Sequence, residues 1–106
     1  MTDSVPSADR AAPASTTLVA FRLYVAGGAP NSLEALSNLK RICEEYLPGN
    51  HQIEVIDVLQ EPRRAVSAGV FVTPMLVKVS PGPARQLVGN LSDRATVVLA
   101  LQLKGG

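Results

Sequence analysis

Residues 18–47, LVAFRLYVAGGAPNSLEALSNLKRICEEYL, constrain the fold more than any other part of the chain. Residues 18–25 are almost continuously apolar and rich in β-branched and aromatic side chains, which predicts a strand buried on both faces. A loop with two glycines and Pro30 follows, and Asn31 is the expected helix cap, with Glu34 as its capping-box partner. The stretch therefore predicts a strand that leads into a helix packed on the same sheet.

The predicted helix carries its apolar residues on one face. They recur at mostly three- and four-residue steps, at Leu33, Leu36, Leu39, Cys43, Tyr46 and Leu47. This spacing is typical of an amphipathic helix that packs on a sheet. Residues 48–50, Pro-Gly-Asn, end the helix, because proline cannot continue it and glycine and asparagine turn easily. His51 follows this turn and is expected to be solvated rather than to bind a metal or act in catalysis.

A second strand and a short helix are predicted next. Residues 52–59 are largely apolar and predict another inner strand, parallel to the first. Asp57 is expected to bond nearby backbone rather than to be a functional carboxylate. Residues 61–68 predict a short helix with proline in its first turn. Its Arg63 and Arg64 are expected to form a solvated face, with contact to an acidic partner as the alternative.

A Thr-Pro pair introduces the third predicted strand. Thr73-Pro74 is followed by the β-friendly residues MLVKV, and the strand should begin at about Met75, since proline is confined to the start of a central strand. The bond between Thr73 and Pro74 is a candidate for the cis form. After a Pro-Gly-Pro turn, residues 85–88 are expected to pair back as a short antiparallel strand.

The last segment suits two kinds of structure. Ser92 is the expected cap of a final helix, and Asp93 favours its positive N-terminal end. Residues 97–99, Val-Val-Leu, are nevertheless β-friendly, so this segment could also form a strand.

The order β-α-β-α-β-β-α predicts an α/β fold with a thioredoxin-like arrangement. A flexible tail is expected at residues 1–17 and a single domain at residues 18–104. Thioredoxins carry Cys-x-x-Cys in the loop after the first strand and a cis-proline before the third. Thr73-Pro74 fits the second feature, but the loop has no thiol. Cys43 falls on the apolar helix face, so a thiol oxidoreductase is disfavoured and a non-enzymatic binding module without a cofactor is expected.

Composition excludes several classes of function. The 106 residues carry a formal net charge of +1 and 4% aromatic side chains, which argues against a nucleic-acid partner. No stretch is apolar enough to span a membrane, and residues 1–17 do not resemble a secretory signal. A single cysteine rules out an internal disulfide, and no residues have metal-ligand spacing. We therefore expect a cytoplasmic protein that contacts neither nucleic acid nor membrane.

Several short words of this sequence are informative in combination: LYVAG at 23–27, PNS at 30–32, IDVL at 56–59, Pro62, Thr73-Pro74, Lys78-Val79, Pro81, Pro83, Arg85 and GNLSDR at 89–94. Together they resemble the KaiB family of circadian-clock proteins. The similarity runs over residues 18–103, and the combination is specific although each word alone is weak. The resemblance implies a non-enzymatic regulator that binds the N-terminal ATPase ring of the hexameric kinase and phosphatase KaiC. In cyanobacteria such regulators then sequester KaiA and displace the sensor kinase SasA.

The resemblance also implies that one sequence adopts two folds. KaiB proteins hold a tetrameric ground state ordered β-α-β-β-α-α-β or a monomeric thioredoxin-like state that binds KaiC, so a dimer or tetramer of this chain stays open. The implied switch region includes Thr73, Pro74, Gly89, Ala100 and Gln102. Many KaiB sequences have Gly and Asp at the last two positions, and alanine is favoured over glycine in a helix by about 1 kcal/mol. We therefore expect the thioredoxin-like fold to dominate.

Partner contact is expected at the sheet edge and the loop after the first strand. The expected contact residues are Arg22, Asn31, Ser32, Lys78 and Arg85, with solvated surface as the alternative for each. Glu34, Glu54 and Gln86 stand where KaiB proteins often carry basic residues, which leaves the identity of the KaiC-like partner open. The competing function is a thioredoxin-like adaptor that, like the sensor domain of SasA, binds a signalling histidine kinase outside a clock.

Overall fold

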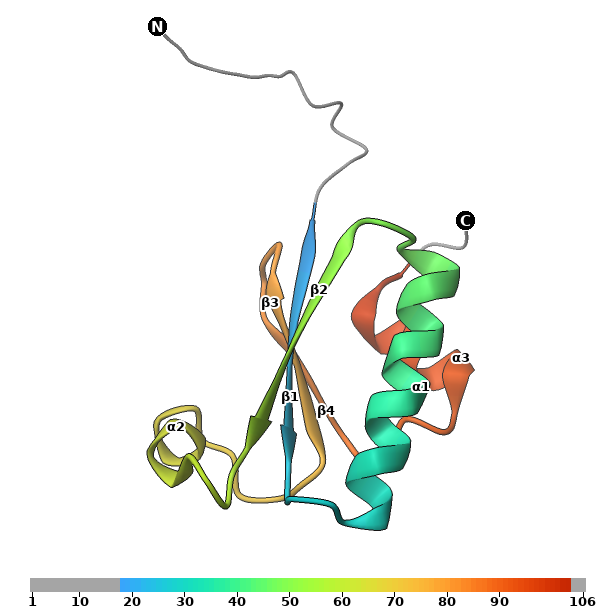
Figure 1. Cartoon of the computed structure of the whole chain (residues 1–106). Coiled ribbons are helices and arrows are strands. Elements are labelled where there is room, and N and C mark those ends of the chain that lie inside the picture. Colours follow the sequence, from blue (N-terminus) through green and yellow to red (C-terminus); the bar gives the residue numbers. More distant parts are fainter. Residues whose placement is uncertain (1–17, 104–106) are drawn as a thin grey trace, which may run out of the picture.

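A four-stranded mixed sheet lies between two helices on one face and a short helix on the other (Figure 1). The computed structural model describes residues 18–103, so the predicted tail and Lys104 lie outside the described residues. The elements are β1 (Val19–Val25), α1 (Pro30–Tyr46), β2 (His51–Asp57), α2 (Pro62–Ser67), β3 (Met75–Ser80), β4 (Arg85–Val88) and α3 (Arg94–Leu101). This order confirms the thioredoxin-like prediction and differs from the alternative order β-α-β-β-α-α-β. No helix within residues 18–103 is long and apolar enough to cross a membrane.

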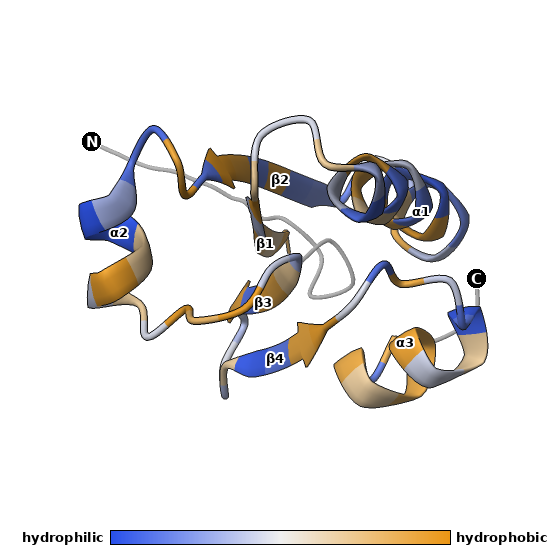
Figure 2. Cartoon of the chain, turned by 90° about the horizontal axis from the view of Figure 1, so that it is seen from below, coloured by the Kyte–Doolittle hydropathy of each residue, from blue (hydrophilic) through white to orange (hydrophobic). Residues whose placement is uncertain are grey.

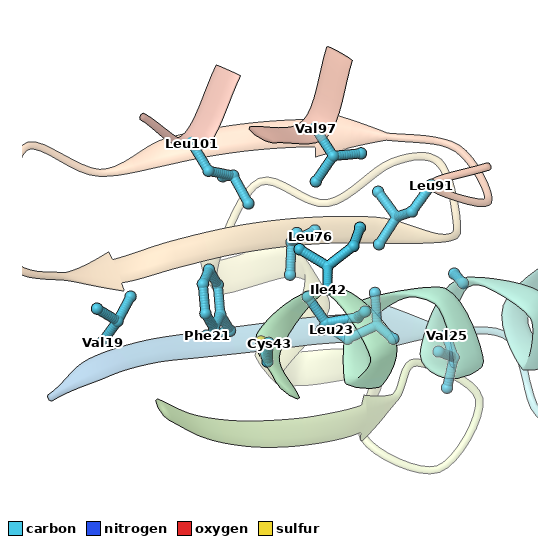
Figure 3. Close-up of a cluster of buried hydrophobic side chains, with 12 residues drawn as sticks. Val19, Phe21, Leu23, Val25, Ile42, Cys43, Leu76, Leu91, Val97 and Leu101 are labelled. Carbon is cyan, nitrogen blue, oxygen red and sulfur yellow. The ribbon is translucent and has the colours of Figure 1, made fainter. Parts of the chain in front are cut away.

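The sheet is built around β1, as its continuous apolarity predicted. The strand order is β2-β1-β3-β4, with β1 parallel to β2 and antiparallel to β3. Alternate side chains of β1 point toward α1 and α3 and form the main core with side chains of both helices (Figure 3). Phe21, Leu23, Leu39, Leu76 and Leu101 are almost completely buried there. Burial of this apolar surface is the main source of stability for a domain of this size.

The opposite face of the sheet is covered only in part. Tyr24 of β1 and Ile56 of β2 pack there with Ala65 of α2 and with Val70 and Met75, in a second, smaller core. Figure 2 shows α2 alone on this face, across the sheet from α1 and α3. Arg22 of β1 and Glu54 of β2, on this face, are therefore exposed.

The second strand corrects one prediction. β2 lies at the edge of the sheet and ends at Asp57, whereas an inner strand running to Leu59 was expected. Its Val55 is 44% exposed although it is apolar. An apolar composition indicates a strand but does not determine how many neighbours it has, because strand order depends on the rest of the chain.

Three predictions about the start of α1 were also wrong. Pro30 occupies the first helical turn and Ala29 is the cap, with no side-chain hydrogen bond, so Asn31 is not the cap. Proline suits this position because it lacks the N–H that the helix start would leave unpaired. Glu34 accepts a hydrogen bond from Asn90 Nδ2 at 3.1 Å instead of closing a capping box. Leu33 is 59% exposed and does not belong to the buried stripe.

The ambiguous last segment is a helix, and its cap is one residue later than predicted. Asp93 rather than Ser92 is the N-cap, and its carboxylate accepts hydrogen bonds from Thr96 N and Thr96 Oγ1. At the other end Gln102 has a left-handed φ of 58°. The N–H groups of Gln102 and Leu103 bond the carbonyls of Leu99 and Val98, which forms a Schellman-type ending.

Candidate partner-binding site

The loop after β1 is held by one side chain of β2, Asp57, and one of α1, Ser32. The Gly27 amide donates to Asp57 Oδ1 at 3.1 Å, and the Leu59 amide donates to the same oxygen at 2.9 Å. Gly27 has a φ of 55°, and a side chain there would lie 3.4 Å from Leu59 Cδ1. Asp57 therefore fixes the loop by bonding backbone, as predicted.

The peptide bond between Thr73 and Pro74, expected as a candidate for the cis form, is cis.

Ser32 belongs to the inside of this loop. Its side chain is only 2% exposed, and its Oγ accepts a hydrogen bond from the Ala26 amide at 3.1 Å. The residue thus stabilises the entry into α1 and does not lie on the surface where a partner contact was expected. Asn31, one residue earlier, is exposed.

The thiol of Cys43 lies in the core and not in the loop after β1. The side chain is completely buried in the main core, on α1 and away from the helix N-terminus. Burial, with a smaller contribution from the Glu44 carboxylate, raises the pKa of the thiol to about 12. Because the thiolate is the nucleophile in disulfide exchange, Cys43 is placed as a core residue, as its position on the helical stripe predicted.

Arg22 lies on the sheet face that α2 covers in part. It is the register partner of Glu54, and its Nε lies 3.3 Å from Glu54 Oε1. Arg64 of α2 reaches the other Glu54 oxygen at 2.8 Å and also lies 3.4 Å from Glu61. The hydrogen bond from Arg64 is the main reason that the pKa of Glu54 lies below its ordinary value. Arg64 is therefore paired rather than simply solvated.

Lys78 and Arg85 lie on the other face, beneath α3. They are register partners across β3 and β4, so two like charges stand side by side. Lys78 Nζ contacts the Leu101 carbonyl oxygen at 3.5 Å, at the negative C-terminal end of α3. Arg85 Nε is buried without an acceptor within the described part of the chain. The predicted contact residues are thus divided between two faces and do not form one surface.

The remaining candidate residues either bond to the fold itself or do not lie close enough together to form a site. His51 Nδ1 lies 2.8 Å from the Leu47 carbonyl oxygen, so the ring is tied to the turn that it follows. Between residues 18 and 103 no group of three His, Cys, Asp or Glu side chains is placed to hold a metal ion. The exposed apolar side chains around α2 were not predicted from the sequence, although Phe71 and Val72, in the apolar run before Thr73-Pro74, were a signal for them.

The comparison with protein families decides the classification. A model of the KaiB domain matches residues 22–103. The chain belongs to the KaiB family. It is 48% identical over 83 residues to the circadian clock oscillator protein KaiB of Microcystis aeruginosa, a match that covers 78% of this chain and 80% of that protein. The corresponding protein of Prochlorococcus marinus subsp. pastoris is 45% identical over 83 residues, with 78% of both chains covered.

Solved structures confirm the thioredoxin-like fold of this KaiB-family chain. The N-terminal domain of Synechococcus elongatus SasA superposes with a TM-score of 0.67 at 24% identity, over 92% of this chain and 97% of that domain. Chloroplastic thioredoxin z superposes with a TM-score of 0.65 at 21% identity, over 84% of this chain and 80% of that protein. At these identities the likeness concerns the fold alone.

Proposed function

We propose that this chain is a non-enzymatic regulator that binds a hexameric KaiC-like ATPase and modulates its phosphorylation cycle in the cytoplasm. The observation that carries the proposal is the match of the KaiB domain over residues 22–103. Identities of 45–48% to circadian clock oscillator proteins over about four fifths of their length support the same role.

The chemistry of the loop after β1 supports binding rather than catalysis. The polar side chains next to the loop are engaged with the fold itself: Asp57 of β2 and Ser32 of α1 accept hydrogen bonds from loop amides, and the thiol of Cys43, further along α1, is buried in the core with a raised pKa. A general acid, base or nucleophile needs access to a substrate. We therefore expect this chain to act by contact with another protein.

The contacts that we propose follow the two faces of the sheet. Arg22 and Asn31 are exposed, on the α2 side and at the start of α1, and Lys78 and Arg85 stand together beneath α3. We also propose that Thr73, Pro74, Gly89, Ala100 and Gln102 belong to a region that rearranges between two folds. A dimer or tetramer would then belong to the second fold, since the resemblance assigns oligomers to that state.

A second candidate has its own supporting observation. The SasA N-terminal domain is covered over 97% of its length by this fold. A thioredoxin-like adaptor that binds a signalling histidine kinase outside a clock is therefore the competing proposal. The two proposals differ in the partner and not in the architecture.

The deciding experiment mixes the purified protein with the KaiC-like ATPase of the same organism in the presence of ATP. Size-exclusion chromatography over one day should show a complex, and the phosphorylation state of the ATPase should change with it. A slowly forming complex would indicate a rearrangement before binding. No complex at tens of micromolar, a binding free energy weaker than about 7 kcal/mol, would overturn the proposal, and a complex with a histidine kinase instead would establish the adaptor.

A further inference from the structure

Large apolar side chains are exposed around α2 on three successive segments. Leu59 precedes the helix, Val66 lies in it, and Phe71 follows it, and these side chains are 70%, 71% and 85% exposed. Large exposed apolar residues on successive segments of the chain commonly mark a contact with another molecule. Figure 2 shows the orange second turn of α2 on the side of the sheet that no other helix covers.

The backbone under these side chains is well anchored. Ala65 of α2 and Val70 after it are buried against Tyr24, Ile56 and Met75 in the second core. The Val70 amide donates to the Ala65 carbonyl, which closes the end of the helix. Because Val70 already fills the inward position, its neighbour Phe71 is directed outward. The apolar surface is thus a fixed feature of the fold.

Two depressions meet at α2 and share Arg63 and Ser67. One, of about 380 Å³, is also lined by Arg22, Arg64, Tyr24 and Ala68, so three guanidinium groups surround it. The other, of about 350 Å³, is also lined by Pro62 and Val66 and is mostly apolar. Arg63 therefore stands between a cationic pocket and an apolar groove.

The charge at this surface is positive and incompletely paired. Arg22 and Arg64 share the single carboxylate of Glu54, and Arg64 also approaches Glu61. Arg63 forms no salt bridge with any residue between 18 and 103. Three arginines thus face two carboxylates. A guanidinium without a partner is suited to a carboxylate from another molecule.

We propose that this α2 surface, formed by Leu59, Pro62, Arg63, Val66 and Phe71, binds a segment of the partner in which an acidic residue adjoins an apolar one. The carboxylate enters the arginine-lined pocket and the apolar side chain lies on Val66 and Phe71. This inference rests on the proposed function, because it assigns the KaiC-like ATPase to this surface. Charge complementarity favours an acidic partner over a second copy, whose own arginines would face these arginines.

The test compares matched exposed variants for binding to the KaiC-like ATPase by biolayer interferometry. Arg63→Glu and Phe71→Ser should each weaken binding by about tenfold or more, as expected of anchors in an interface. Arg41→Glu makes the same charge change, and Leu33→Ser the corresponding change from a large apolar side chain to serine, at exposed positions of α1 on the other side of the sheet, and both should stay within about twofold. The loss caused by Arg63→Glu should shrink as salt is raised, because screening weakens the charge contact in the wild type.

Each outcome has a separate meaning. Binding by the wild type and by all four variants alike would overturn the α2 surface and leave the proposed function intact. No binding by the wild type would overturn the proposed function and this inference with it. Light scattering gives the oligomeric state, and a dimer that Phe71→Ser dissociates while ATPase binding is unchanged would assign the surface to a second copy and overturn the proposal. Unchanged circular dichroism of the exposed variants establishes that they fold.

Discussion

α1 and α3 lie on the same face of the sheet, but the structure holds them in different ways (Figure 1). α1 has 17 residues and buries five side chains, whereas α3 has 8 residues and buries only Val97 and Leu101. Leu99 in the middle of α3 is 80% exposed. A short helix with little buried surface depends more on its local sequence and its caps than a long buried one does. α3 should therefore respond to changes that α1 would tolerate.

The contacts that fix α3 are also of a different kind. Arg94 forms an ion pair with Glu45 of α1 at 2.8 Å, but both side chains are about half exposed, so the pair contributes little. Lys78 reaches the last carbonyl of the helix, and Asp93 caps its first turn. These polar contacts are local, and they can be lost without opening the main core. If the chain adopts a second fold, α3 should be the first element of the thioredoxin-like fold to unfold.

The largest effect is expected in α1. Leu39→Ala should lower the free energy of unfolding by about 3 kcal/mol, because it leaves a cavity where a completely buried side chain stood. Urea denaturation followed by circular dichroism measures the loss. Leu33→Ala removes the same atoms from an exposed position of the same helix and should cost less than about 0.5 kcal/mol. Equal losses in the two variants would show that α1 is not held by its buried side.

Ala100→Gly should act next most strongly, and locally. Glycine in a helix is about 1 kcal/mol less favourable than alanine, so amide hydrogen exchange in α3 should become about fivefold faster. The amides of α1 should keep their protection. Ser37→Gly, at an exposed position of α1, should leave the exchange of α3 unchanged. If Ala100→Gly loosened both helices equally, α3 could not be an independently opening unit.

The difference between the two helices also explains what could be predicted from the sequence. Leu39, Cys43 and Tyr46 repeat with helical spacing, so the existence and inner face of α1 followed from the pattern. Leu33 has the same spacing but lies in the first turn, beyond the neighbours that could cover it. A period identifies a face of a helix and not the extent of what packs against it.

The candidate site was less predictable than the fold. Basic residue types suggested Arg22, Lys78 and Arg85 as one group, but the period of 2 in a strand sends Arg22 to one face of the sheet and Lys78, the register partner of Phe21, to the other. Ser32 is buried and accepts a hydrogen bond from the Ala26 amide, six residues away. Such contacts arise from the path of the chain, which composition and spacing do not determine.

The cap of α3 should make its stability depend on pH. Hydrogen bonds from the Thr96 side chain and, next, the Thr96 backbone hold the pKa of Asp93 below its ordinary value of 3.8. A lowered folded-state pKa means that the cap stabilises α3 fully above the ordinary value and loses that effect as pH falls through the folded-state pKa. Amide exchange near neutral pH should be faster in α3 of Asp93→Ala than of the wild type, and exchange in α1 should not change.

The control for this cap is its predicted neighbour. Ser92→Ala should leave α3 unchanged, since the Ser92 side chain takes no part in the cap. Melting curves of the wild type and Asp93→Ala between pH 6 and about pH 3 should converge toward the acid end. Curves that stayed parallel would show that the carboxylate contributes no charge-dependent stabilisation.

The smallest effect is expected at Gln102, the left-handed residue of the Schellman-type ending, and it has the opposite sign. Gln102 carries a left-handed φ of 58°, which costs a residue with a Cβ about 1 kcal/mol. Gln102→Gly removes this cost but adds freedom to the unfolded chain, so the net gain should be about 0.5 kcal/mol, or about 3 °C in melting temperature. Gln102→Ala keeps the Cβ and should bring no gain. An equal gain in stability for Gln102→Ala would show that the gain comes from loss of the glutamine side chain and not from relief of the backbone conformation. Glycine at 102 would then stabilise the same helix that glycine at 100 loosens, two residues apart.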